Sequence, residues 1–266
     1  MISMSSKVTK ATAASEKQPV AAAKRIPYPI LLLSIVVCLV YAGSMTFNFT
    51  ELDDTIFILE NESYNSQLSN LTHSFTRGVF SETEDTYYRP VLLDSYILNH
   101  TFAGSDIRYY HLVNLLLHWI AVCLLYLLLL KLLRKPRVAF ILALLFAVHP
   151  VLSQAVAWIP GRNDTLMAVF GFAFMWLCIR FMEQGSWRDL LLQFLCWLLL
   201  LFTKESALFF APGFMHLVIT FTELNWKSKK NGLVYASWVL GLLIWFALRA
   251  MATVKNDPIQ FTTLLA

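Results

Sequence analysis

Long apolar runs separated by short polar stretches make up most of the chain from Ile30 onward. Each run predicts a membrane-spanning helix, because a crossing of the hydrocarbon core takes about 20 predominantly apolar residues. The pattern predicts about seven spans, at residues 30–49, 109–133, 138–151, 165–182, 190–203, 206–222 and 233–250. The third and fifth runs are short, so we expect them to extend into the polar stretches beside them. The hydrophobic pattern therefore predicts an all-α polytopic membrane protein.

The polar positions divide the chain into a membrane domain and two tails. Residues 1–29 predict a disordered cytoplasmic tail, residues 30–250 a membrane domain, and residues 251–266 a short non-cytoplasmic tail. Between the first two spans lies a long outer loop, residues 50–108. Its apolar periodicity predicts short amphipathic helices at the membrane interface, over residues 64–80 and 90–102.

Composition agrees with a membrane location, since 58% of the residues are hydrophobic and only 14% are charged. Such a chain is too apolar for a soluble domain, and nothing in it indicates a nucleic-acid partner. All 4 cysteines fall inside apolar runs, with neither a metal-ligand spacing nor a disulfide framework. The polar first 25 residues and the long run after them do not predict a cleavable signal peptide.

Charge placement predicts the orientation of the spans. With the N-terminus inside, 14 of the 21 Lys and Arg residues fall in inner segments, and 13 of the 17 Asp and Glu residues fall in outer ones. An excess of basic residues marks the cytoplasmic side. We therefore expect a multi-pass protein with a cytoplasmic N-terminus, whose residues 53–54, 149–164 and 204–205 all lie on the non-cytoplasmic side.

Asp53 and Asp54 stand directly after the first predicted span. Taken alone, they are best explained as a solvated pair of loop charges. Alternatively they face a cavity, where one carboxylate acts as general base on an acceptor hydroxyl and the other orients it or shares its proton. Their position on the same side as the other polar motifs favours the second alternative.

Three polar residues of the second span, His111, Asn114 and His118, follow the spacing i, i+3 and i+7 and so share one helix face. We expect them to line the protein interior and to make hydrogen bonds between helices. A metal site is disfavoured, because no compact set of His or Asp partners follows.

The stretch 146–164 contains two helix-breaking points, Pro150 and Pro160 with Gly161. Irregular backbone at membrane depth is tolerated where it lines a cavity or is buried in protein. We therefore expect His149 and Arg162 to point into a cavity. The alternative is a re-entrant connector whose Arg reaches toward the interface.

Lys204 and Glu205 interrupt two apolar runs. Either they form a neutralising structural pair, or Lys204 faces an anionic phosphate with Glu205 as its partner. In or near the outer loop, four Asn-x-Ser/Thr triplets start at Asn48, Asn61, Asn70 and Asn99 and add a weak indication of a lumenal or extracellular loop.

In order, the motifs are the acidic pair, YYRP (87–90), H-x-x-N-x-x-x-H (111–118), FAVHPV…AVAWIPGRND (146–164) and TKES (203–206). This arrangement resembles the multi-span GT-C glycosyltransferases. The likeness covers about residues 30–220 and is closest to the tetratricopeptide-carrying O-mannosyltransferases of the endoplasmic reticulum and their bacterial relatives. The most specific element is HPV…AVAW…GR-x-D.

The resemblance implies transfer of a hexose, usually mannose in this family, from a polyprenyl-phosphate carrier to a protein or glycan hydroxyl. The expected face is non-cytoplasmic, in the endoplasmic reticulum membrane or a bacterial inner membrane. It implies that Asp53 or Asp54 is the catalytic base. The basic residues expected to hold the lipid phosphate are Arg89, His149, Arg162 and Lys204, and those expected to line the cavity are His111, Asn114, His118 and Glu205. No cofactor is required, although a divalent metal bound by both aspartates stays open.

Two departures from the family pattern leave an alternative open. Leu152 stands where the family often has a second His after the His-Pro pair, and no repeat of tetratricopeptide period follows the spans. The chain is therefore either a sufficient catalytic core or a truncated, non-catalytic homologue that acts as a partner or scaffold. A transporter is disfavoured, because no inverted repeat is visible.

Overall fold

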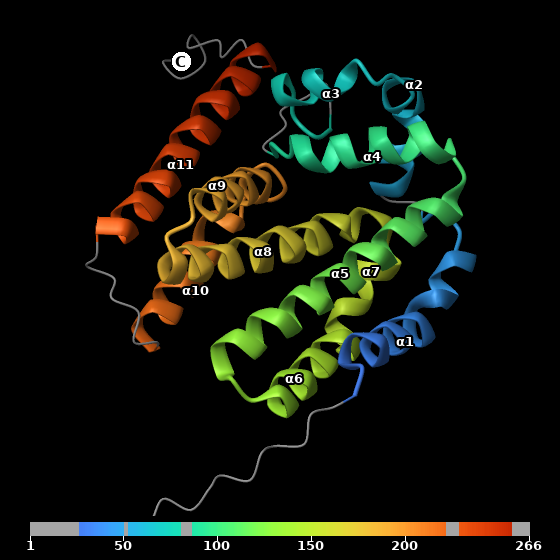
Figure 1. Ribbon diagram of the computed structural model, residues 1–266. Helices are drawn as coiled ribbons and strands as arrows, with labels where there is room; N and C mark the ends of the chain where they lie inside the picture. The colour runs from blue at the N-terminus through green and yellow to red at the C-terminus, as the bar shows by residue number, and fades with distance from the viewer. Residues whose placement is uncertain (1–26, 51–52, 81–86, 222–228, 257–266) are drawn as a thin grey trace, which may run out of the picture.

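The computed structural model describes residues 27–50, 53–80, 87–221 and 229–256 (Figure 1). Within these ranges the chain forms helices and turns, with no strand. The longer helices are α1 (Pro29–Tyr41), α4 (Pro90–Ala103), α5 (Ile107–Leu133), α6 (Pro136–Val148), α8 (Arg162–Gln184), α9 (Trp187–Leu201), α10 (Ala207–Phe221) and α11 (Lys229–Asn256). Nearly all of the predicted N-terminal tail and most of the C-terminal tail lie outside the described residues.

Short helical turns connect the long helices. The outer loop contains a π-helical turn η2 (Thr55–Glu60), α2 (Glu62–Asn65), α3 (Asn70–His73) and the turn η3 (Ser74–Thr76) before α4. Between α6 and α8 lie the turn η4 (Pro150–Leu152), α7 (Ser153–Ala157) and the turn η5 (Ile159–Gly161). We call residues 149–161 the bent segment. The expectation of short helices in the outer loop is confirmed.

Local sequence explains where several helices begin and end. The Asp106 side chain accepts a hydrogen bond from the Arg108 backbone N–H and caps the start of α5. Helix α5 ends at Arg134, whose φ of 54° is left-handed, and Pro136 then starts α6. Gly185 ends α8 at a φ of 70°, a conformation that favours glycine.

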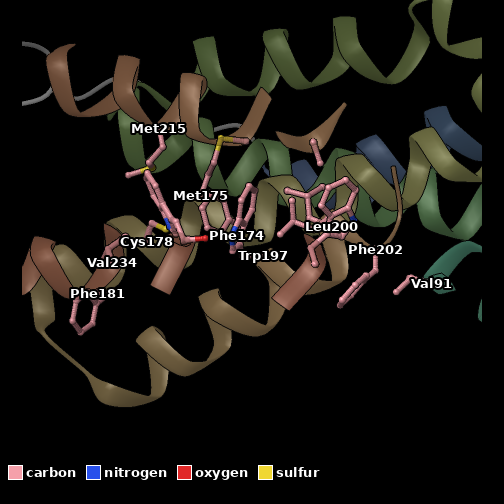
Figure 2. Close-up of a cluster of buried hydrophobic side chains, with 14 of the residues drawn as sticks. Val91, Phe174, Met175, Cys178, Phe181, Trp197, Leu200, Phe202, Met215 and Val234 are labelled. Atoms are coloured by element: carbon pink, nitrogen blue, oxygen red, sulfur yellow. Dashed lines mark hydrogen bonds between the residues drawn. The ribbon is translucent and has the colours of Figure 1, made fainter. Parts of the chain in front are cut away.

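Helix α5 is the central element, in contact with α1, α6, α7 and α8, while α8 continues the assembly toward α9 (Figure 1). The largest core joins α8, α9, α10 and α11, and Figure 2 shows Phe174, Trp197 and Met215 within it. There the Trp197 indole N–H donates to the Trp238 carbonyl at 3.1 Å. Apolar packing supplemented by hydrogen bonds between helices is how membrane bundles are stabilised.

The predicted fold class is confirmed, although fewer spans reach full length than the sequence suggests. Four stretches are long and apolar enough to cross a membrane: Pro29–Thr46, Ile107–Leu133, Ile159–Gln184 and Asn231–Ala252. The bent pair Pro136–Val148 and Pro150–Ala157, at 48°, raises the number to five. The expected spans at 190–203 and 206–222 form α9 and α10, each of 15 residues. Among the described residues there are therefore more long helices than helices of sufficient length to cross a membrane.

Candidate functional site

The bent segment is held in place by the polar face of α5. The Asn114 side-chain amide donates to the carbonyls of Trp158 and Ile159, at 3.1 and 3.2 Å. The His118 Nε2 lies 3.1 Å from the Ala147 carbonyl oxygen, at the end of α6. The prediction that this face bonds to neighbouring helices is confirmed for Asn114 and His118.

Gly161 allows the bent segment to fold back on itself. A Cβ atom at this position would lie 2.5 Å from the Gln154 carbonyl oxygen and 2.8 Å from the Ala155 Cα. Both are backbone atoms that cannot move aside easily, so the turn into α8 requires glycine. The close approach fixes where α8 starts and therefore where Arg162 stands.

Arg162 is fully buried, with 0% of its surface exposed. Its Nε donates to the Asn114 Oδ1 at 2.8 Å. Its Nη2 donates to the Asn99 Oδ1 at 2.8 Å and to the Tyr110 carbonyl at 3.1 Å. Its Nη1 lies 3.2 Å from the Ser95 carbonyl and 3.5 Å from the Ser95 hydroxyl. These acceptors match the five N–H donors of a guanidinium, and they join α4, α5 and α8 at one point.

The acidic pair differs sharply between its two members. Asp54 is buried, and its Oδ2 accepts two hydrogen bonds of 2.8 Å, from the backbone N–H and the hydroxyl of Thr50. Its Oδ1 is also buried but has no hydrogen-bond partner within the described part of the chain. Asp53 is half-buried. Asp54 is therefore a carboxylate whose orientation is fixed while one oxygen stays unused.

Tyr96, on α4, adds a second unused polar group near the acidic pair. Its hydroxyl is buried and has no hydrogen-bond partner among residues 27–50, 53–80, 87–221 and 229–256. Both aspartates lie within electrostatic reach of it, and the Arg162 Cζ is 4.8 Å from the centre of its ring. Burial raises the pKa of the Tyr96 hydroxyl, so the group stays protonated and remains a donor.

His111 is the third member of the α5 polar face and lies close to the same region. Asp54 is within electrostatic reach of its buried ring, and backbone groups of Phe47 and Ala157 lie beside it. Neither ring nitrogen makes a hydrogen bond of normal geometry with a described residue. The three-residue face is therefore divided: Asn114 bonds to the bent segment, His118 contacts the end of α6, and His111 lies within electrostatic reach of Asp54.

Two ion pairs connect the other predicted site residues. The Arg89 Nε lies 2.9 Å from the Glu205 Oε2, and the backbone N–H of Tyr88 donates to the Glu205 Oε1 at 2.9 Å. Lys204 pairs with Asp164, and its Nζ also lies 3.4 Å from the Asn163 Oδ1. The expected pairing of Lys204 with Glu205 is wrong, because each residue pairs with a distant partner. A phosphate contact of Lys204 stays a prediction.

A cavity of about 400 Å³ lies between the end of α6, the bent segment and α8. Asp164 contributes to its wall, so the Lys204 ion pair stands beside it. Its large apolar lining residues are Phe146, Val151, Leu152, Trp158, Met167 and Phe172. His149 is exposed, and its Nδ1 accepts a hydrogen bond from the Val151 N–H at 3.3 Å, which caps the turn beside the cavity.

Neither the unpartnered hydroxyl of Tyr96 nor the pairing role of Asp164 was predictable from the residue pattern. In the sequence Tyr96 is an ordinary core position of an amphipathic helix. Asp164 belongs to the motif at 146–164, and nothing in its neighbours indicates Lys204 as its partner. Among the described residues, no group of three or more His, Cys, Asp or Glu could hold a metal ion. A metal bound through Asp53 and Asp54 together therefore stays an untested expectation.

A family model described as dolichyl-phosphate-mannose-protein mannosyltransferase matches residues 96–250. The human protein O-mannosyl-transferase TMTC1 is 32% identical over 160 residues, 58% of this chain and 18% of that protein. The Xenopus laevis protein O-mannosyl-transferase tmtc2 is 39% identical over 112 residues, 42% of this chain and 13% of that protein. For the mouse protein O-mannosyl-transferase TMTC4 the identity is 31% over 176 residues, 59% of this chain and 24% of that protein.

The chain thus spans less than a quarter of the length of these curated relatives. No solved structure matches it significantly. The matched family region begins at Tyr96 and ends at Ala250, so it contains Arg162 and Lys204 but neither the acidic pair nor Arg89.

Proposed function

Because the chain belongs to the dolichyl-phosphate-mannose-protein mannosyltransferase family, we propose that it transfers a hexose from a polyprenyl-phosphate carrier to a protein hydroxyl. Mannose is the expected sugar, since the relatives reported above are named O-mannosyl-transferases. A glycan hydroxyl is the alternative acceptor. The observation that carries the proposal is the buried Asp54 carboxylate, fixed through one oxygen and unused at the other.

The proposed face of the membrane is the non-cytoplasmic one. The distribution of Lys and Arg residues supports a cytoplasmic N-terminus, with the acidic pair on the opposite side. The ion pair of Lys204 with Asp164 supports a position of Lys204 at the same end of α8 as the bent segment. The endoplasmic reticulum membrane is the proposed location, because the relatives reported above come from animals and four Asn-x-Ser/Thr triplets lie in or next to the outer loop.

The apolar cavity beside the bent segment suits the hydrocarbon chain of the donor. Its walls are mostly Phe, Trp, Val, Leu and Met side chains, and its size is that of a small-molecule site. Lys204 lies next to it through the ion pair with Asp164. In the proposed complex the donor phosphate takes the place of Asp164 on the Lys204 ammonium.

The four residues expected to hold the phosphate differ in how far solvent reaches their side chains. The side chains of Arg89 and Lys204 are 15% and 25% exposed, and His149 is exposed, whereas Arg162 is fully enclosed. A phosphate can reach only the first three without dismantling the core. We therefore assign phosphate binding to Arg89 and Lys204, with His149 beside them, and a positioning role to Arg162.

In the proposed reaction Asp54 is the general base and Asp53 its half-exposed neighbour. The Oδ1 of Asp54 takes the proton of the acceptor hydroxyl while the oxygen of that hydroxyl attacks the anomeric carbon of the sugar. The bond from that carbon to the phosphate oxygen breaks, and the electron pair leaves with polyprenyl phosphate. In this proposal the cations of Arg89 and Lys204 stabilise the charge that develops on the phosphate. A single displacement inverts the anomeric configuration.

A non-catalytic role as partner or scaffold is the second candidate. The ion pairs of Arg89 with Glu205 and of Lys204 with Asp164 favour it, because both cations already have internal counter-ions. In that case the charged groups stabilise the fold and bind no donor. The two candidates differ in one measurable property, which is transfer by the purified chain.

The test uses the full chain in lipid vesicles, with dolichyl-phosphate mannose as donor and a Thr-containing peptide as acceptor. We expect mannosyl transfer by the unmodified protein, and Lys204→Ala should raise the KM for the donor by about tenfold through loss of one charged contact. The KM for the peptide should stay unchanged.

Lys131→Ala is the matched control. Lys131 also forms an ion pair, with Glu183 at 2.6 Å, and its side chain is 23% exposed, close to the 25% of Lys204. It lies on the predicted cytoplasmic side, so its loss should leave the KM for the donor unaltered. Folded protein without any transfer would support the scaffold role, and equal effects of the two lysine substitutions would refute the phosphate site.

A further inference from the structure

Tyr96 has a polar group that the fold does not use. The residue is 0% exposed, its ring stacks on Phe57 at 5.8 Å between centroids, and the Arg162 guanidinium covers it. Its hydroxyl has no hydrogen-bond partner among the residues that the structure describes. An unpaired buried hydroxyl lowers stability, and a phenylalanine would fill the same space without that cost.

Tyr88 shows what a structural tyrosine looks like in the same part of the molecule. It is 1% exposed, and its hydroxyl donates to the Phe75 carbonyl at 2.9 Å. The fold therefore accounts for the Tyr88 hydroxyl, because removing it would leave a carbonyl without its donor. The two tyrosines are equally buried and differ in whether the hydroxyl has a partner.

The unused hydroxyl of Tyr96 has a chemical counterpart nearby. Asp54 lies within electrostatic reach of it, and its Oδ1 is a buried acceptor without a partner in the described chain. The Tyr110 hydroxyl is also unpartnered there, but Asp54 Oδ1 is the carboxylate among these groups. Thr50 fixes the second carboxylate oxygen, so Oδ1 cannot turn away to find a partner without breaking two hydrogen bonds. Phe57, whose ring stacks on Tyr96, follows Asp54 by three residues, so this donor and this acceptor belong to the same part of the core, and neither has a hydrogen bond of its own.

One ligand class complements this pair of groups. An alcohol hydroxyl donates one hydrogen bond and accepts others through its lone pairs, so it can serve the carboxylate and the phenol together. An anion would be repelled by Asp54, and an apolar group would leave both polar atoms unpaired. A hydroxyl is also the group that an acceptor must present to a sugar-transfer reaction.

We propose that Tyr96 and Asp54 form the binding site for the acceptor hydroxyl, with Tyr96 donating to the acceptor oxygen and Asp54 accepting its proton. This inference rests on the proposed function and names the residue that positions the acceptor. In the reaction the acceptor O–H bond breaks toward Asp54 and the new bond forms at the anomeric carbon. The phosphate leaves with the electron pair, and Tyr96 keeps its proton throughout.

Tyr96→Phe removes a single oxygen atom and tests the proposal. Unfolding temperature in detergent should stay the same or rise, because an unpaired group is removed. The kcat/KM for a Thr-containing peptide should fall by about tenfold, the value of one neutral hydrogen bond, while the KM for dolichyl-phosphate mannose stays unchanged.

Tyr88→Phe is the matched control with the opposite expectation. It removes the hydrogen bond to Phe75 and leaves the backbone contact of Tyr88 intact, so the unfolding temperature should fall while transfer per folded molecule stays within about twofold. A Tyr96→Phe protein that keeps its full kcat/KM for the peptide would overturn the inference. So would a fall in its unfolding temperature that matches the fall for Tyr88→Phe.

Peptide binding separates this inference from the proposed function. Affinity is measured by calorimetry for a Thr-containing peptide and for the same peptide with Ala at that position, against the unmodified and Tyr96→Phe proteins. If transfer is absent but only the unmodified protein prefers the Thr peptide, the acceptor site stands and the proposed function fails. If neither protein distinguishes the peptides, the acceptor site is wrong whether or not transfer occurs.

Discussion

Arg162 and Asp54 are both charged and both buried, yet their surroundings use them differently. Each N–H of the Arg162 guanidinium meets an acceptor on α4 or α5. Asp54 is fixed through one oxygen, and its other oxygen meets no partner in the described residues. A saturated buried charge is what a structural role requires. An unsaturated one costs stability and needs another explanation, for which ligand binding is the natural candidate.

The same distinction applies to neutral side chains around the site. Asn114 bonds to the bent segment and His118 contacts the end of α6, so both hold neighbouring backbone against α5. Tyr96 has a hydroxyl without a described partner. These polar groups thus fall into a bonded set that positions the site (Arg162, Asn114 and His118) and a pair, Asp54 and Tyr96, that has polar atoms available to a ligand.

The largest expected effect concerns the bonded set. Arg162→Met should lower the free energy of unfolding by about 3 kcal/mol or more, because several buried acceptors lose their donor at once. Thermal unfolding in detergent measures this loss. The KM for the donor, measured under conditions in which the variant is folded, should not change.

Arg162→Lys is the control for charge. It keeps the cation but loses the planar fork that reaches three helices, so it should also be destabilised, by a smaller amount. If Arg162→Met were as stable as the unmodified chain and bound donor more weakly, Arg162 would be a phosphate ligand. The contrast between a structural Arg162 and a ligand-binding Asp54 would then be wrong.

Asp94 is an intermediate case and gives a smaller effect. Its Oδ1 accepts a hydrogen bond from the Ser74 hydroxyl at 2.6 Å, but burial dominates and raises its pKa to about 6. Since an unfolded Asp has a pKa of about 3.9, the native state binds this proton more tightly, and stability falls as the pH rises from about 4 to about 6.

Asp94→Asn should remove this part of the pH dependence, because asparagine does not titrate. Thermal unfolding of both proteins between about pH 4 and pH 7 measures the difference. An identical slope for the two proteins would show that Asp94 is solvated in the native state.

Much of the fold followed from the hydrophobic pattern. The runs at 109–133 and 233–250 correspond to α5 (Ile107–Leu133) and α11 (Lys229–Asn256), and the predicted helix at 90–102 is α4 (Pro90–Ala103). Helical spacing alone also placed Asn114 and His118 on one bonded face. These features are local, so a period of 3.6 residues is enough to predict them.

The pairings of the site depend on tertiary structure and were not predictable in the same way. Glu205 follows Lys204 directly, yet its partner is Arg89, more than a hundred positions earlier in the chain. Arg162 was expected to point into a cavity and instead enters the core, because Gly161 turns it toward α4 and α5. Tyr96 carried no sequence signal, since a buried tyrosine with a bonded hydroxyl has the same pattern as one without.

The central claim is that the unused oxygen of Asp54 takes the acceptor proton. Asp54→Asn keeps the size of the side chain and removes the base, and the measurement is the kcat for mannosyl transfer in lipid vesicles at matched amounts of folded protein. The account predicts a fall of about 100-fold or more, with a smaller fall for Asp53→Asn. Transfer by Asp54→Asn at the rate of the unmodified chain would contradict it.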